Sequence, residues 1–187
     1  MSNGAYDLEG VIWHQHSNKL MVKLLELWPD KNVPIVDLGC GHNFYCSVFD
    51  AVGYDAVGID FVKLKGVDDV ADLTATADEF YNPNYLKRKS NVLSLEVGEH
   101  IPYNLSDNYL NNITRYSRDI VMSWAVPGQA GVGHINCQTN EWVAEQMAKR
   151  GYKHVAEKTK ELREAVNGCH CTWFLNTLMY FTPNNIL

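Results

Sequence analysis

The stretch IVDLGCGHNFY, residues 35–45, constrains the fold more than any other part of the sequence. An apolar run reaches an acid, Asp37, and a loop follows with two glycines one residue apart, Gly39 and Gly41. Apolar runs without alternation are typical of strands buried on both faces of a parallel sheet. Glycines after such a strand let the backbone approach a ligand closely. The stretch therefore predicts a nucleotide-like ligand at the end of a parallel strand.

Strand-like and helix-like segments alternate along the rest of the chain. Ser17 is expected to cap a first helix that stops at Pro29. Alternation of this kind predicts an α/β fold with a mostly parallel sheet and helices on both faces. Strands are expected within residues 33–39, 54–61, 67–74, 91–102, 118–129, 152–157 and 169–183, and helices within 44–52, 107–117, 139–151 and 158–167, with a broken helix at 78–90.

Size and charge limit the classes of function that need to be considered. A chain of 187 residues with 46% hydrophobic residues suits one domain with one sizeable core. The net charge of -6 argues against a general electrostatic grip on nucleic acid. The apolar runs are too short for a membrane span, and the N-terminus lacks the pattern of a secretory signal. Five cysteines without a disulfide-like spacing are expected to be reduced thiols, which favours a cytoplasmic protein.

Two ligands compete for the glycine loop. A dinucleotide loop needs a small third residue so that the helix packs under a pyrophosphate, and Phe44 stands at that position. A methionine nucleoside carries no phosphate and tolerates an acid, Asp37, near its ammonium group. The acid at the end of the next strand, Asp60, can accept both ribose hydroxyls of either ligand. Phe44 therefore favours the methionine nucleoside over a nicotinamide cofactor.

Four segments in order, VDLGCG, GID, ADL and LEVGEHIP, resemble the class I S-adenosylmethionine-dependent methyltransferases. The resemblance covers about residues 33–155. It implies a Rossmann-like, seven-stranded sheet whose last strand is antiparallel, with residues 152–181 supplying the last two strands. It also implies S-adenosyl-L-methionine as cofactor and a single domain, with an N-terminal lid and helix at 1–32, a cofactor-binding core at 33–156 and a C-terminal helix and strand at 157–187. The implied donor-binding residues are Asp37, Gly39, Cys40, Gly41, Asn43, Asp60, Asp72, Leu73 and Glu96.

Two of these positions carry reservations of their own. Asn43 stands where the family often has a third glycine, and asparagine tolerates left-handed backbone better than most residues. The loop is therefore expected to keep its shape with altered contacts. Asp72 could instead simply cap a turn.

Acceptor chemistry is expected after the fourth and fifth strands. Methyl transfer to a hydroxyl needs alignment and removal of a proton, by a base or with the help of a metal. The candidate catalytic residues are Glu99, His100 and His134. In one interpretation His134 or His100 is a general base. In a second, these three and Glu96 bind a divalent cation, a pattern resembling metal-dependent O-methyltransferases that act on RNA 3′ ends and on ubiquinone precursors. In a third, Glu99 caps a turn and His100 packs near Pro102.

Several weaker signals lie around this core. The loop SWAVPGQAGVGHIN is expected to shape the acceptor pocket, with Trp124 and Gln129 lining it. Trp13 and His14, just before the first helix, are expected to contact the donor. Cys169 and Cys171 are expected to be core thiols that share one side of the last strand.

Together these patterns predict an S-adenosylmethionine-dependent methyltransferase that O-methylates a small molecule, a sugar or another exposed end group. The expected partner is a small-molecule or glycan acceptor, with nucleic acid unlikely and no membrane. The alternatives are a non-catalytic S-adenosylmethionine-binding partner or regulatory module, and a metal-dependent methyltransferase of RNA ends.

Overall fold

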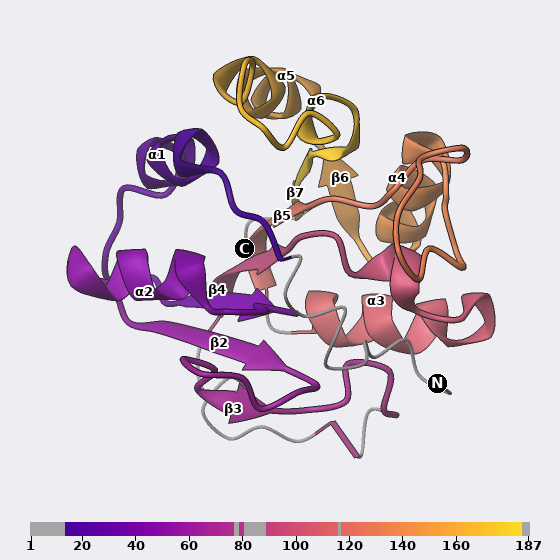
Figure 1. Cartoon of the computed structure of the whole chain (residues 1–187), viewed down its shortest axis with the longest axis horizontal. Coiled ribbons are helices and arrows are strands. Elements are labelled where there is room, and N and C mark those ends of the chain that lie inside the picture. The colour runs from indigo at the N-terminus through magenta and orange to yellow at the C-terminus, as the bar shows by residue number, and fades with distance from the viewer. Residues whose placement is uncertain (1–13, 77–78, 81–88, 116, 185–187) are drawn as a thin grey trace.

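The strands of the protein form one sheet, and their order in the sheet differs from their order along the chain. The computed structural model describes residues 14–76, 79–80, 89–115 and 117–184. Within them a seven-stranded sheet has the order β3-β2-β1-β4-β5-β7-β6 (Figure 1). The strands are β1 (Ile35–Leu38), β2 (Ala56–Asp60), β3 (Asp69–Val70), β4 (Ser90–Ser94), β5 (Ser117–Met122), β6 (Tyr152–His154) and β7 (Met179–Pro183).

The first five strands run parallel and the last strand runs against its neighbours. β1 lies between β2 and β4, with Ile35 opposite Ala56 and Asn91. β7 is inserted antiparallel between β5 and β6, with Val121 opposite Tyr180. The prediction of a mostly parallel sheet with an antiparallel last strand is confirmed, and residues 152–181 do contribute to the last two strands. The third strand spans only two residues.

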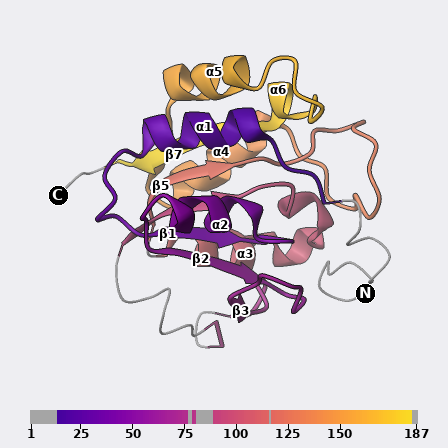
Figure 2. The ribbon, with the colours of Figure 1, turned by 60° about the vertical axis from the view of Figure 1, so that its left-hand side comes forward.

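Helices cover both faces of the sheet, as predicted (Figures 1 and 2). Residues of β1 alternate between two buried clusters: Ile35 packs on one face, and Val36 and Leu38 on the other. The first face is covered by α1 (Asn18–Leu27), α2 (Phe44–Ala51), α5 (Ala156–Ala165) and α6 (Phe174–Thr177), and the second by α3 (Ser106–Thr114) and α4 (Asn140–Lys149). Within the described residues, no helix is both long and apolar enough to span a bilayer.

The predicted helix caps are present. The Ser17 side chain accepts a hydrogen bond from the Leu20 N–H, and α1 ends at Leu27, two residues before Pro29. Thr139 caps α4 in the same way. These side chains satisfy N–H groups that have no partner inside the helix.

One predicted element is wrong, and one lies mostly outside the described chain. Residues 169–183 form a turn, the short helix α6 and then β7, not one long strand. Cys169 and Cys171 therefore do not share a strand face. A short apolar run does not distinguish a buried helix from a strand, and here Phe174 packs into the face formed by α1 and α2. Of the broken helix predicted at 78–90, only residues 79, 80, 89 and 90 belong to the described residues.

Candidate functional site

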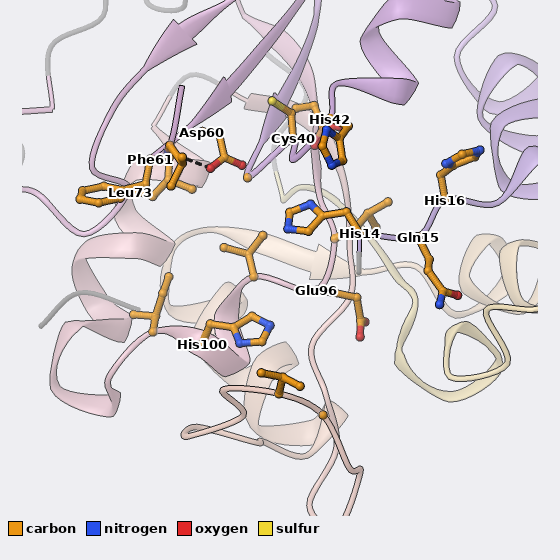
Figure 3. Close-up of a pocket in the computed structure, with 18 of the residues that line it drawn as sticks. His14, Gln15, His16, Cys40, His42, Asp60, Phe61, Leu73, Glu96 and His100 are labelled. Atoms are coloured by element: carbon orange, nitrogen blue, oxygen red, sulfur yellow. Dashed lines mark hydrogen bonds between the residues drawn. The ribbon is translucent and has the colours of Figure 1, made fainter. Parts of the chain in front are cut away.

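A cavity of about 390 Å³ opens at the carboxyl ends of the parallel strands. This is where open α/β sheets bind ligands, and the volume suits a small molecule. Asp60 and Leu73 lie at one end of the cavity and Glu96 and His100 at the other, with His14 between them (Figure 3). The predicted residues in its lining are His14, Asp37, Gly39, Cys40, Asp60, Asp72, Leu73, Glu96, His100, Gln129 and His134.

The glycine loop is shaped by the strand beside it. The N–H groups of Gly39 and Cys40 both donate to the Ile59 carbonyl oxygen, at 2.8 and 3.2 Å. Gly39 has a φ of 86°, and a Cβ there would lie 2.4 Å from the Val97 side chain. This position therefore requires glycine both for its backbone and for its space.

Asp60 ties that loop to the end of β2. One carboxylate oxygen accepts the Gly41 N–H at 2.8 Å, and the other accepts the Val62 N–H at 3.1 Å. Gly41 itself is not among the residues that line the cavity. Asp60 thus has its orientation fixed by backbone donors while its carboxylate still borders the cavity.

Asn43 supports the loop from behind the cavity wall. It has a φ of 58°, which confirms the left-handed backbone expected of it. Its amide nitrogen donates to the Gly66 carbonyl oxygen at 2.5 Å and to Asp68 Oδ2 at 3.0 Å. Asn43 does not line the cavity, so in this structure its contacts hold the loop together.

Asp72 does two things at once. Its Oδ1 accepts the Thr74 N–H at 2.8 Å and the Thr74 hydroxyl at 2.6 Å, which is the turn cap that was the alternative for it. Asp72 and Leu73 also line the cavity.

Asp37 is the most deeply buried acid on the donor side. Its side chain is 2% exposed and borders the cavity. Burial, with a smaller contribution from the charge of Asp60, raises the pKa of Asp37 to about 7. A cationic group of a ligand placed here would stabilise the ionised carboxylate.

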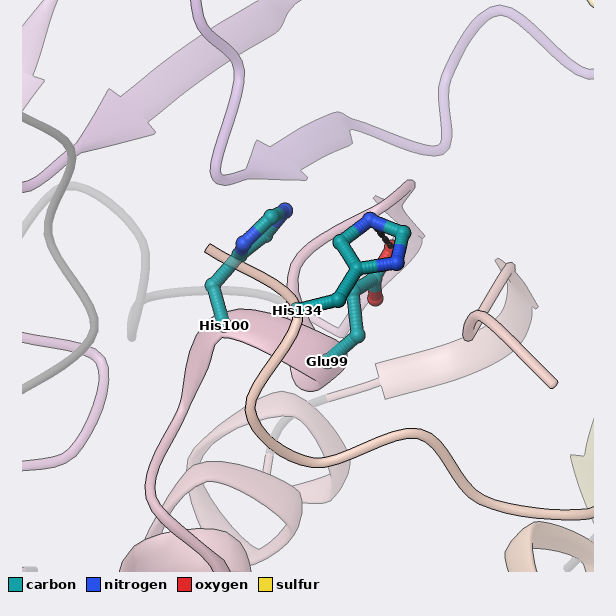
Figure 4. A group of neighbouring side chains, drawn as sticks. All are labelled: Glu99, His100 and His134. Atoms are coloured by element: carbon teal, nitrogen blue, oxygen red, sulfur yellow. Dashed lines mark ion pairs between the residues drawn. The ribbon is translucent and has the colours of Figure 1, made fainter. Parts of the chain in front are cut away.

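Glu99, His100 and His134 converge on the acceptor side (Figure 4). Glu99 and His100 belong to the 3₁₀ helix η2 (Gly98–His100), and His134 comes from the loop after β5. One possible ligand atom from each lies within 4.8 Å of the other two. His134 Nε2 is 4.0 Å from Glu99 Oε1.

Each histidine ring is oriented by a backbone carbonyl. Nδ1 of His100 lies 3.0 Å from the Gly133 oxygen, and Nδ1 of His134 lies 3.2 Å from the Gln129 oxygen. Both contacts favour the tautomer with hydrogen on Nδ1 and the lone pair on Nε2, the usual arrangement of metal-binding histidines. Burial lowers the pKa of His100 to about 4, so its ring is neutral near pH 7.

Glu99 is fully buried, and neither of its carboxylate oxygens accepts a hydrogen bond of normal geometry from the described residues, although the backbone N–H groups of Glu99 and Ala125 lie close enough to favour its ionised form. Burial, and next the charge of Glu96, raises the pKa of Glu99 well above its usual value. Buried acids normally have partners, so this carboxyl group calls for a proton or a cation.

Glu96 lines the cavity together with His100 and His134. It has a φ of 54°, which is strained for a residue with a side chain, and its N–H donates to Ser123 Oγ at 2.8 Å. Burial raises the pKa of Glu96 as well. Thr177 and Gln129 approach its two carboxylate oxygens at 3.5 and 3.4 Å.

The segment before α1 borders the donor half of the cavity. Trp13, also expected to contact the donor, lies outside the residues that the structure describes. The His14 ring lies against Gly41, where a Cβ would be 1.9 Å from His14 Nδ1. His16 stacks on Phe44, with ring centroids 3.7 Å apart. Phe44 thus forms part of the cavity wall, where a pyrophosphate loop would have a small residue.

The position of Trp124 differs from the prediction. It was expected to line the acceptor pocket together with Gln129, but it is fully buried and does not border the cavity. Its ring packs between Tyr109 and Trp142, and its Nε1 donates to the Asn136 carbonyl oxygen at 2.6 Å. An apolar strand end gives no sign of which way its last aromatic side chain points.

Sequence reasoning missed part of the lining. Phe61 directly follows Asp60, and His42 lies inside the glycine loop, so position alone could have indicated both. Trp173 and Phe174 also border the cavity. The sequence did not indicate that they line a cavity, because their segment was expected to be a strand.

No protein-family model and no curated protein matches the sequence. Solved structures do match it over most of its length. Magnesium protoporphyrin IX methyltransferase from Synechocystis PCC 6803, with bound S-adenosylhomocysteine, is 14% identical with a TM-score of 0.56, and the match covers 92% of this chain and 91% of that one.

Two further structures match similarly. 1,6-Didemethyltoxoflavin-N1-methyltransferase from Burkholderia thailandensis is 14% identical with a TM-score of 0.57, covering 90% of this chain and 79% of that one. A small RNA methyltransferase is 12% identical with a TM-score of 0.60, covering 90% of this chain and 25% of that one. Together with the strand order, these matches show that the chain has the class I methyltransferase fold.

Proposed function

We propose that the protein is an S-adenosylmethionine-dependent O-methyltransferase that holds its acceptor with a divalent cation. The observation that carries the proposal is the convergence of Glu99, His100 and His134: the two histidines line one end of the cavity, and Glu99 is buried beside them without lining it. The fold supports methyl transfer but does not decide it, because one fold hosts many reactions.

The donor half of the cavity suits S-adenosylmethionine. Structures of the same fold contain S-adenosylhomocysteine or S-adenosylmethionine. In this chain the Asp37 carboxylate would face the ammonium group, Asp60 would accept the ribose hydroxyls, and Leu73 with Phe61 would flank the adenine. Asp60 is well prepared for that role because two backbone N–H groups already fix its orientation.

The acceptor half suits a cation. Glu99 offers two buried oxygens that accept no hydrogen bond of normal geometry from the described residues, and both histidines are turned so that Nε2 can bind a metal. Glu96 is the candidate fourth ligand. Imidazole together with carboxylate favours a transition-metal ion over magnesium. A six-coordinate ion held by these four residues would keep two positions for oxygens of the acceptor.

The residues of the chain have distinct tasks in this proposal. When bound, the donor would supply an electrophilic methyl group and leave as S-adenosylhomocysteine, and the cation would lower the pKa of an acceptor hydroxyl so that its proton can pass to water. The carbonyl oxygens of Gly133 and Gln129 fix the orientation of the His100 and His134 rings, and with it the direction of the lone pair on each Nε2. Glu96, two residues after the end of β4, borders the cavity and would help to position the donor relative to the acceptor. Alignment of this kind accounts for a large share of catalysis by transferases.

A histidine general base is the competing interpretation. It would need His100 or His134 to take the acceptor proton without a metal. The lowered pKa of His100, about 4, makes that ring a weak base, so among the two His134 is the better candidate.

The first experiment is a calorimetric titration of the purified protein with S-adenosylmethionine, S-adenosylhomocysteine and NAD, each with and without Mn²⁺. Binding of both sulfur nucleosides and none of NAD is expected. Turnover should then stop on addition of a chelator and return with Mn²⁺. Unchanged turnover in the chelator would rule out the cation and leave His134 as base. Binding of NAD alone would overturn the donor assignment.

A further inference from the structure

The loop between β5 and α4, residues 126–138, holds His134 against the 3₁₀ helix that carries Glu99. The N–H groups of Ile135 and Asn136 both donate to the Glu99 carbonyl oxygen, at 2.9 and 3.0 Å. Asn136 is itself buried. These bonds fix the backbone on one side of His134, so the direction of its ring depends on the space that the other side of the loop leaves open.

Gly131 lies against the His134 ring. A Cβ built on Gly131 would lie 2.1 Å from His134 Nε2 and 2.2 Å from Cε1, which is too close for any side chain. The ring therefore fills the space beside the Gly131 Cα, and in this position its Nε2 lies 4.0 Å from Glu99 Oε1. Gly131 also borders the cavity.

Space alone accounts for a glycine at position 131. Gly128 and Gly133, in the same loop, have φ values of 87° and 74°, which favour glycine for the backbone. Gly131 is not among the described glycines with a positive φ, so its backbone can accommodate alanine. It is exposed, and the three atoms nearest to an added Cβ all belong to the His134 ring.

Gly98, the residue before Glu99, shows what happens when the neighbouring ring cannot move. A Cβ there would lie 2.3 Å from Trp124 Cε3, and the fully buried Trp124 packs against Tyr109 and Trp142. A side chain at that position would strain the core. The His134 side chain is 11% exposed, so its ring can turn about its own side-chain bonds while the rest of the fold stays in place.

We propose that Gly131 is a positioning residue for the candidate cation site, because the absence of a side chain there allows His134 Nε2 to face Glu99. A methyl group at position 131 turns the ring away from Glu99 and from His100, whose ring centroid lies 5.1 Å from that of His134. The inference rests on the proposed function for the role of the cation, but the position of the ring can be measured without a metal.

Nuclear magnetic resonance of the metal-free protein, isotope-labelled at histidine, tests the ring position. In the wild type the ring protons of His100 and His134 should show a nuclear Overhauser effect, because the two rings are close. In Gly131→Ala this effect should be lost. His134→Gln identifies the His134 signals.

Calorimetry with Mn²⁺ supplies the second arm. Gly131→Ala should weaken Mn²⁺ binding at least about tenfold, the size of effect seen when a residue that orients a metal ligand is changed. S-adenosylhomocysteine affinity and the melting temperature should not change, since only one ring has to move. Ile135→Ala is the matched control, because Ile135 is 62% exposed on the same loop and does not line the cavity. It should leave the ring contact and Mn²⁺ affinity as in the wild type.

The outcomes separate this inference from the proposed function. If the ring contact and Mn²⁺ affinity survive in Gly131→Ala, Gly131 does not position His134. A joint fall of Mn²⁺ affinity, S-adenosylhomocysteine affinity and melting temperature would also overturn the inference, because it would indicate a general role in folding. If the wild type binds no Mn²⁺ while the ring contact still depends on Gly131, the positioning of His134 stands and the cation proposal fails.

Discussion

The two ends of the cavity treat their acids in opposite ways. At the donor end, Asp60 and Asp72 each accept two hydrogen bonds from neighbouring groups, so their orientation is set before any ligand arrives. At the acceptor end, the Glu99 carboxyl is buried, and its oxygens accept no hydrogen bond of normal geometry from the described residues. Asp60 and Asp72 are thus oriented before a ligand binds, whereas Glu99 still needs a proton or a cation.

The largest effect should come from removing the charge of Glu99. Glu99→Gln should weaken Mn²⁺ binding and lower turnover at least ~100-fold. This loss should exceed the loss caused by removing a residue that only hydrogen-bonds to a metal ligand, because Glu99 would bind the ion directly. The metal-free variant should be as stable as the wild type or more stable, because a buried acid without hydrogen bonds of normal geometry is lost. Calorimetry with Mn²⁺ and thermal unfolding measure the two effects.

Glu145→Gln is the matched control, since Glu145 is exposed on α4 and pairs with Lys149. It should leave both quantities unchanged. A Glu99→Gln variant that binds Mn²⁺ like the wild type would mean that the two ends of the cavity do not differ as described.

Loss of Asp60 should affect the donor end alone. Asp60→Asn loses the charge that holds the Gly41 and Val62 N–H groups, which we expect to cost roughly 10–100-fold in S-adenosylmethionine affinity. Mn²⁺ affinity should stay the same. Equal losses at both ends would show that the cavity responds as one unit.

The buried carboxyl of Asp37 should make donor binding depend on pH. With a folded-state pKa of about 7, donor affinity should rise about tenfold between about pH 6 and about pH 8, as the carboxylate becomes available to the ammonium group. Titrations across this range measure the slope. In Asp37→Asn the slope should vanish and binding near pH 8 should be weaker.

The same group links pH to the stability of the ligand-free protein. In the unfolded chain Asp37 ionises near pH 4, whereas in the folded protein it keeps its proton to about pH 7. The folded state therefore binds more protons in that window, and the contribution of Asp37 to stability falls as pH rises through it. A melting temperature near pH 8 that is lower in Asp37→Asn than in the wild type would contradict this.

Substitution of Asn43 should have the smallest effect on ligand binding, because Asn43 supports the glycine loop and does not line the cavity. Asn43→Ala should lower the free energy of unfolding by about 1–3 kcal/mol through the lost bonds to Gly66 and Asp68. Donor affinity of the folded protein should change less than about threefold. Asn43→Gly should recover about 1 kcal/mol, because glycine adopts left-handed backbone without strain.

The residues of the donor end could be predicted from the sequence because they belong to short, continuous sequence patterns. A strand, an acid and two glycines follow one another in residues 35–41, and Asp60 closes the next strand in the same way. The acceptor end depends on a fold-back that spacing does not encode: His134 reaches Glu99 because two N–H groups of its own loop bind the Glu99 carbonyl. The sequence was compatible with three interpretations of this end, and the proximity of Glu99, His100 and His134 is visible only in the structure.

The errors have the same origin. Trp124 was expected to line the pocket because it lies in a glycine-rich segment, yet Tyr109 and Trp142 enclose it. Residues 169–183 looked like one strand because their apolar residues do not alternate. Tertiary packing decided both cases, since Phe174 and Trp124 each fill a space that elements distant in sequence create.

The insertion of β7 between β5 and β6 also has a consequence for synthesis. Among the described strands β6 pairs with β7 alone, so residues 152–154 have no place in the sheet until residues 179–183 have left the ribosome. The strands β1 to β5 can assemble while the chain is still growing, because their parallel pairings with one another need no residue beyond β5. Thr177, the last residue of α6, approaches Glu96 and takes its position in that final step. The contact between Thr177 and Glu96 is therefore among the last to form at the cavity as the protein is made.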